Sequence, residues 1–365
     1  MEASYQQRPI GVLSEASGRR LTAVIACRVL GFSLLDPAAQ ERRLARWGMV
    51  LSGAGGSPIR RIQWIERTSP SQGDELAKWL RAERDPAIPP RGTPMIESYL
   101  ELIESSARVT QEHEILLAVQ VDSNRVRDRD ATVDSLLDET ERVVNGLGDA
   151  EITVLGALNA GHLARALRTA FDPYARAELA ALEASDAERD GLAPDGAWPL
   201  ATVECWDHYR TDGAVHATYW IAAWPRTEVS PMFMHALLGS SSAVRSVAVT
   251  FEPLAIDRST REVEAAITRD RADRELRTRF GQSETARQRQ AHEATARREA
   301  ELAAGHGEVR LSGFVTVSGR DPDDLRRSCA EVLDHAARAH LELRRLYGQQ
   351  AEAFTFTLPL GRGLR

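Results

Sequence analysis

The predicted order of strands and helices recurs along this chain, and the recurrence constrains its fold more than any other feature. Each half reads as hairpin, helix, strand, long helical stretch, strand, helix, strand. The first hairpin is predicted within residues 21–35, and a helix begins after it at Asp36-Pro37. The last helix is predicted at 321–347, with carboxylates from Asp321 onward at its start, and "AFTFTLPL" is predicted as the final strand. The clearest match sets "HEILLAVQVDS" and "EITVLGAL", separated by a predicted helix, beside "GEVRLSGFVTVSG" and "AEAFTFTLPLG", separated in the same way. Identity between the halves is low, so the pattern carries the argument. We predict an internal duplication with an offset of about 190 residues.

The length of the chain suits two domains of similar build. A sequence of 365 residues is long enough for two ordinary cores. We predict an α+β fold of two similar halves, each a mixed β-sheet with helices on one face. The stretch "DAERDGLAPDGAWP" is rich in Asp, Gly, Pro and Ala and marks the boundary. The predicted units are therefore a first half at 1–185, a linker at 186–199 and a second half at 200–365.

A long charged helical arm is predicted within the second half, at residues 257–304. The stretch carries 11 Arg and 10 Asp or Glu residues, a balance that is typical of a solvated or coiled helical face. Phe280-Gly281 interrupts the pattern, and Ser283 is placed to cap a second helix, so we expect a projecting helical hairpin. Because the acids neutralise the arginines locally, direct binding to nucleic acid is not expected, and DNA binding by these arginines is the lesser alternative.

The composition is that of an ordinary globular protein in a reducing compartment. Hydrophobic residues make up 43% and charged residues 27% of the chain, and the net charge of −7 argues against a nucleic-acid footprint over the whole protein. The three cysteines lie far apart and form no CxxC pair. The apolar stretch 21–35 contains Arg28 and is too short to span a bilayer. We expect a cytoplasmic protein.

Motifs for nucleotide binding or catalysis are missing from the sequence. Gly361 and Gly363, close to the carboxyl terminus, lie one residue apart with no lysine after them, whereas a Walker loop needs four residues between its glycines and a following Lys. GxSxG, HExxH and DxDxDG do not occur either. We therefore predict a protein that is not an enzyme and needs no cofactor.

The hairpin "ATVECWDHYR-TDG-AVHATYWIAAW" offers the one candidate metal pair. With the turn centred on Asp212, His208 lies directly opposite His216. Two histidines are too few for a zinc site, which takes three or four ligands, and Cys205 points to the other face of the hairpin. A half-buried histidine pair is the preferred interpretation, and a metal-dependent enzyme using these two residues is the alternative of another class.

The same register places three tryptophans on one face of the hairpin. Aromatic side chains beside Arg and His are typical of protein interfaces, although helices of the same domain could equally cover them. We name as candidate interface residues the three tryptophans and three apolar residues of the predicted final strand: Trp206, Trp220, Trp224, Phe354, Phe356 and Leu358.

Three stretches resemble a group of actinobacterial proteins that are encoded with conjugation and type IV secretion genes. They are "SLLDPAAQERRLARWGMVL" (33–51), "ECWDHYRTDGAVHATYWIAAWPR" (204–226) and "LELRRLYGQQAEAFTFTLPLGRGL" (341–364). That group is similar to the non-ATPase amino-terminal domain of the CagE/TrbE-type secretion ATPase, in which "LPLG" at the end of a strand leads into the motor. Members of the group usually begin with two membrane helices, which this sequence lacks before "IGVLSEASGRRLTAVIACRV".

The resemblance implies a scaffold or assembly component of a type IV-like conjugative DNA-transfer or secretion apparatus. Its expected partners are a separate secretion ATPase and membrane channel subunits, and another copy of the same chain is a further option. It would lie at the inner face of the cell membrane, attached through its partners or through an anchor absent from this chain. A cytosolic component of a type VII (ESX-like) secretion machine is the alternative.

Overall fold

The structure is a computed structural model that describes most of the chain. The described residues are 1–29, 31–70, 111–125, 129–176, 191–225, 229–239, 241–254 and 307–364, with a few isolated positions between them. The predicted charged arm at 257–304 lies outside the described residues.

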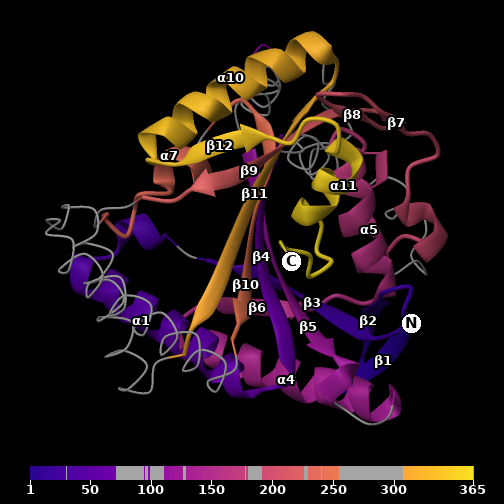
Figure 1. The fold of residues 1–365 in the computed structure, drawn as a ribbon, viewed down its shortest axis with the longest axis vertical. Helices are drawn as coiled ribbons and strands as arrows, with labels where there is room; N and C mark the ends of the chain where they lie inside the picture. Colours follow the sequence, from indigo (N-terminus) through magenta and orange to yellow (C-terminus); the bar gives the residue numbers. More distant parts are fainter. Residues whose placement is uncertain are drawn as a thin grey trace, which may run out of the picture.

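The described chain is built on one large sheet in which all strand pairs are antiparallel. Its main path runs β1-β2-β3-β5-β4-β10-β11-β9-β8-β7, while β6 pairs with β3 and β12 with β9 (Figure 1). The strands are β1 (Glu2–Tyr5), β2 (Arg8–Ser14), β3 (Arg20–Arg28), β4 (Ile59–Pro70), β5 (Gln111–Asp122), β6 (Thr153–Ala157), β7 (Val203–Glu204), β8 (Tyr209–Arg210), β9 (Val215–Ala223), β10 (Val244–Pro253), β11 (Val309–Gly319) and β12 (Glu342–Arg345). The predicted α+β class is confirmed. We predicted a separate mixed sheet in each half, whereas the structure has one antiparallel sheet that both halves share.

The strand order is the same in the two halves. The first half runs β6-β3-β5-β4 and the second β12-β9-β11-β10, and β4 pairs with β10 over seven residue pairs at the centre. In each half, a residue in the left-handed conformation stands between the long helix and the last strand. These residues are Glu151 (φ 59°) and His340 (φ 57°), and they are 189 positions apart. These are likenesses of topology and local backbone. A duplication of the sequence stays a prediction.

Helices cover both faces of the sheet, which corrects the prediction that they lie on one. The helices packed against one face are α1 (Pro37–Gly53), α4 (Arg129–Asp149), α7 (His235–Leu238) and α10 (Pro322–Arg338), and those on the other are α5 (Ala160–Phe171) and α11 (Gln350–Phe354) (Figure 1). Adjacent residues of β4 mark the two faces, because Trp64 packs with the first set and Ile65 contacts the core beneath α5.

Local capping signals mark where the two helices α1 and α10 begin. Asp36 precedes Pro37 at the start of α1, and its Oδ1 accepts a hydrogen bond of 2.9 Å from the amide of Ala39. Asp321 precedes Pro322 at the start of α10 and accepts from two amides in the same way. Both predicted helix starts are confirmed.

Two predicted strands are wrong. The first hairpin is formed by β2 and β3 rather than within residues 21–35, where β3 ends at Arg28 and the short 3-10 helix η1 (Phe32–Leu34) follows. The final stretch "AFTFTLPL" forms α11 and the 3-10 helix η5 (Thr355–Thr357), and the last strand is β12, inside the predicted helix 321–347. Pro359 has no amide hydrogen to give to a ladder, which disfavours a strand here.

The two halves are joined by more than the sheet. The segment after α11 crosses back over β10 and β4, so that the Gln63 side chain donates to the carbonyl of Phe356 and accepts from the amide of Gly361, at 2.7 and 2.8 Å. At the predicted linker, described from residue 191, Gly191 lies against Gly161 of α5. Residues of the second half therefore complete the core of the first.

Candidate interaction surface and apolar groove

The histidine pair predicted on the second hairpin is not formed. The hairpin turns over the two residues Asp212 and Gly213, so Arg210 pairs with Val215 and Tyr209 with His216. Asp-Gly is a favoured two-residue hairpin loop. Centring the turn on Asp212 alone shifts the pairing by one residue, and because side chains alternate, that shift moves His208 out of line with His216.

His216 is a satisfied core histidine. It is wholly buried, and its Nε2 lies 3.0 Å from the carbonyl of Phe171 while its Nδ1 lies 2.8 Å from the hydroxyl of Ser318. Since a carbonyl can only accept, Nε2 carries the proton and Nδ1 accepts from the serine. Burial lowers the pKa of His216 to about 4. Across the described part of the chain, no three His, Cys, Asp or Glu side chains gather as metal ligands.

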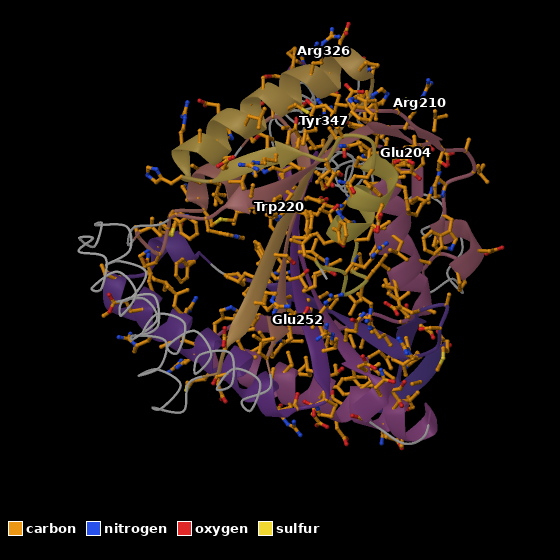
Figure 2. The ribbon with its side chains drawn as sticks, in the orientation of Figure 1. Glu204, Arg210, Trp220, Glu252, Arg326 and Tyr347 are labelled. Atoms are coloured by element: carbon orange, nitrogen blue, oxygen red, sulfur yellow. The ribbon has the colours of Figure 1, made fainter. Side chains whose placement is uncertain are left out.

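The three tryptophans named from the sequence lie in three different environments. Trp206 is 72% exposed, at the sheet edge near β7. Trp220 is half-buried and pairs with Phe314 on the face that carries α11, near the centre of the view in Figure 2. Trp224 follows the end of β9 and faces the opposite side, where it lines a groove. The structure does not bring them together.

None of the three predicted interface residues near the carboxyl terminus belongs to the exposed surface around Trp206. Phe354 and Leu358 are 2% and 1% exposed and belong to the core that also contains Phe171. Phe356 is half-buried and stacks on Phe314, with ring centroids 4.4 Å apart. These side chains hold the chain together.

Exposed large apolar side chains lie instead on residues 198–206, which lead into and follow β7, and on Tyr347 after β12, whose ring stacks on that of Trp206. We call this the edge surface, and it comprises Trp198, Leu200, Val203, Trp206 and Tyr347, each at least half exposed. Glu204 of β7, Arg210 of β8 and Tyr347 lie toward the same end of the molecule (Figure 2). Among the described strands, β7 ends the sheet path, so this apolar surface sits at the end of the described sheet.

Trp206 and Tyr347 are held in place although they are exposed. Their rings stack at 6.2 Å between centroids, and the amide of Gly348, at φ 71°, donates to the carbonyl of Trp206 at 2.7 Å. A Cβ at Gly348 would lie 2.8 Å from the Trp206 ring, so only glycine fits. The Arg345 guanidinium lies over the Tyr347 ring at 5.9 Å. The pair is thus a rigid aromatic platform.

An apolar groove lies on the face of the sheet that carries α1, α4 and α7, between these three helices. It has a volume of about 480 Å³, and both halves contribute to its walls. Six aromatic side chains line it: Phe32, Trp47, Trp64, Trp224, Phe233 and Phe251. Among the described residues that line the groove, Arg43 is the only charged one.

Two arginines share one carboxylate beside the groove. The Nε and Nη2 atoms of Arg43 lie 2.9 and 2.8 Å from Oε2 of Glu151, and Nη1 of Arg46 lies 2.8 Å from Oε1. The hydrogen bond from Arg43 lowers the pKa of Glu151, which is therefore ionised at neutral pH. Its chain neighbours Ala150 and Ile152 line the groove, so this charge cluster belongs to the rim.

Comparison with protein-family models finds no match, and comparison with curated proteins finds none either. Within the described residues, the helices are too short or too polar to cross a membrane.

The residues named from the sequence include Trp206 of the edge surface and Trp224 of the groove, but the sequence did not predict the groove itself. Trp206 was named, but Tyr347 lay in a predicted helix. The groove unites residues from Cys27 to Leu311, and no local pattern predicts such a meeting. The one available signal was the number of tryptophans, seven in a chain with 6% aromatic residues.

Proposed function

We propose that this chain is a non-catalytic scaffold component of a type IV-like conjugative DNA-transfer or secretion apparatus, at the cytoplasmic side of the membrane. Its partner would be a separate secretion ATPase. The observation that carries the proposal is the edge surface, because an exposed, stacked Trp–Tyr pair at the end of the described sheet is of the kind that protein interfaces use.

The resemblance of three stretches to conjugation-associated proteins supplies the partner class. Two of these stretches, 204–226 and 341–364, contain Trp206 and Tyr347. The stretches that carry the resemblance thus meet in space at the edge surface, which supports a role for that surface in assembly.

The metal-dependent enzyme is the weaker alternative. His216 is fully buried and has both ring nitrogens engaged, and His208 bonds to Asp207 at 2.7 Å. Neither side chain faces the other across the hairpin.

The test is a pull-down of tagged full-length chain from a detergent-solubilised actinobacterial lysate that contains conjugation proteins, with the secretion ATPase quantified by mass spectrometry. The double variant Trp206→Ser/Tyr347→Ser removes the aromatic platform. Since a buried aromatic hot spot contributes about 2 kcal/mol or more, we expect the variant to recover at least about tenfold less ATPase.

Leu155→Ser/Leu333→Ser is the matched control, because both leucines are exposed apolar residues outside the edge surface. It should recover as much ATPase as the unchanged chain. Circular dichroism verifies that each variant folds. Recovery of no secretion ATPase, or equal recovery by the platform variant, refutes the proposal. Truncation at Ala353 would be a poor test, since it removes buried core residues.

A further inference from the structure

The apolar groove has no part in the proposed assembly role, and its chemistry points to a ligand of its own. Its volume of about 480 Å³ falls in the range of small-molecule sites in proteins. Trp64 and Val249, which pair across the central strands β4 and β10 of the two halves, line it, together with Trp47 of α1 and Phe233 just before α7. The groove is therefore a feature of the joined halves.

The lining selects for a ligand that is apolar over most of its length. Aromatic and aliphatic side chains make up nearly all of the described wall, so a polar ligand would lose its hydrogen bonds to water and gain few in return. An aliphatic chain loses no hydrogen bonds on entering and gains contacts with the aromatic rings.

The rim selects for one negative charge. Arg43 lines the groove, Arg46 follows it on α1, and both pair with the single carboxylate of Glu151, so this three-residue cluster has a net charge of +1. Arg46 is 36% exposed at its side chain, so it can turn from Glu151 to an incoming anion. Arginine suits this role because its planar guanidinium matches a carboxylate.

We propose that the groove binds one long-chain carboxylate of the fatty-acid class, with its aliphatic chain along the aromatic lining and its carboxylate at Arg43 and Arg46. The proposal rests on the groove and its rim alone and is independent of the secretion role. A free fatty acid is the committed occupant, because a single carboxylate balances the net charge of +1 on the cluster of Arg43, Arg46 and Glu151.

The experiment titrates the full-length chain with oleate below its micellar concentration, by calorimetry and by tryptophan fluorescence, since Trp47, Trp64 and Trp224 line the groove. We expect one oleate per chain. Oleyl alcohol, which has the same chain without the charge, should bind several-fold more weakly, and Arg46→Gln should remove that difference.

Two rim leucines test the location. Leu44 and Leu311 line the groove and are 44% and 47% exposed, so Leu44→Glu/Leu311→Glu places charges there at little cost to folding. Oleate affinity should fall at least about tenfold. Leu333→Glu is the control, because Leu333 is 40% exposed on α10 and does not line the groove. Its affinity should not change.

Several outcomes overturn the proposal. They are no binding of oleate to the full chain, equal affinity in the Leu44→Glu/Leu311→Glu variant, equal affinity for oleyl alcohol, and binding to anionic vesicles without binding to monomeric oleate. Thermal melts show which variants are folded and can be interpreted.

Discussion

At the scale of single residues, His216 is a candidate metal ligand in the sequence but a buried core residue in the structure. Its imidazole is closed in by Phe171, Thr211 and Ser318, and Phe354 lies 4.7 Å away between ring centroids. A neutral imidazole fits these partners, because one nitrogen donates to a carbonyl and the other accepts from a hydroxyl. Protonation would place an unpaired charge in the core.

The consequence is a pH-dependent contribution to stability. The pKa of His216 is about 4 in the folded chain, against the ordinary 6.5 once unfolded, so the unfolded state binds more protons between these values. The stability due to neutral His216 is complete above pH 6.5 and is lost as pH falls to 4. We predict that the difference in free energy of unfolding between wild type and His216→Gln shrinks by about 3 kcal/mol over this range.

Urea unfolding at several pH values measures this difference. Thr218→Val, a change of a buried residue on the same strand that does not titrate, serves as the control, and its difference from wild type should stay constant. Carboxylates titrate in all three proteins, so their contributions to the free energy of unfolding cancel in these differences. A His216→Gln difference that is independent of pH contradicts the prediction.

At the scale of elements, the carboxyl-terminal segment is ordered by side chains rather than by strand pairing. Gln63 bonds to it at two points, Thr250 donates to the carbonyl of Arg362 at 2.7 Å, and Gln120 donates to that of Leu360. These side chains project from three adjacent strands of the central sheet. The segment thus takes the place of a helix on that face.

Graded truncation tests its contribution. A chain ending at Phe354 loses the buried Leu358 and leaves the amide of Gln63 without partners, and we expect it to lose about 5 kcal/mol of unfolding free energy. A chain ending at Leu360 keeps Phe356 and Leu358 and should lose only about 2 kcal/mol. Urea unfolding followed by tryptophan fluorescence gives both values. Equal stability of the two truncated chains would contradict this account.

At the scale of the whole molecule, the seam between β4 and β10 makes two similar halves into one body. Seven residue pairs join the strands, and the carboxyl-terminal segment crosses the seam. Neither half can unfold without exposing a central strand of the other. Cooperativity between the halves follows from this arrangement.

We predict that both halves unfold in one transition. Cys27 and Cys329 are buried in the first and second half, and pulsed thiol alkylation with peptide mass spectrometry reports on each. Both thiols should become reactive at the same urea midpoint. Val332→Ala, which removes about 2 kcal/mol from the second half alone, should lower both midpoints equally. A shift of Cys329 without Cys27 would mean that the halves unfold separately.

Local signals in the sequence correctly predicted those features of the fold that depend on only a few neighbouring residues. The Asp-Pro starts of α1 and α10, the second hairpin and the α+β class are of this kind, because caps and turns act within about four residues. The register of that hairpin was missed by one residue, and its faces were assigned wrongly as a result. Trp206 was a candidate because the predicted register placed it with two other tryptophans on one face of the hairpin, although the structure does not bring the three together.

The sequence by itself determined the starts of α1 and α10, the place of the second hairpin and the class of fold, since these follow from hydrophobic period and local hydrogen bonding. Only the tertiary structure decided that β4 pairs with β10, that the last segment is not a strand, and that Tyr347 joins Trp206. The groove also exists only in the folded chain. Its walls come from residues far apart in the sequence, and the contacts that unite them depend on long-range packing, which local patterns do not record.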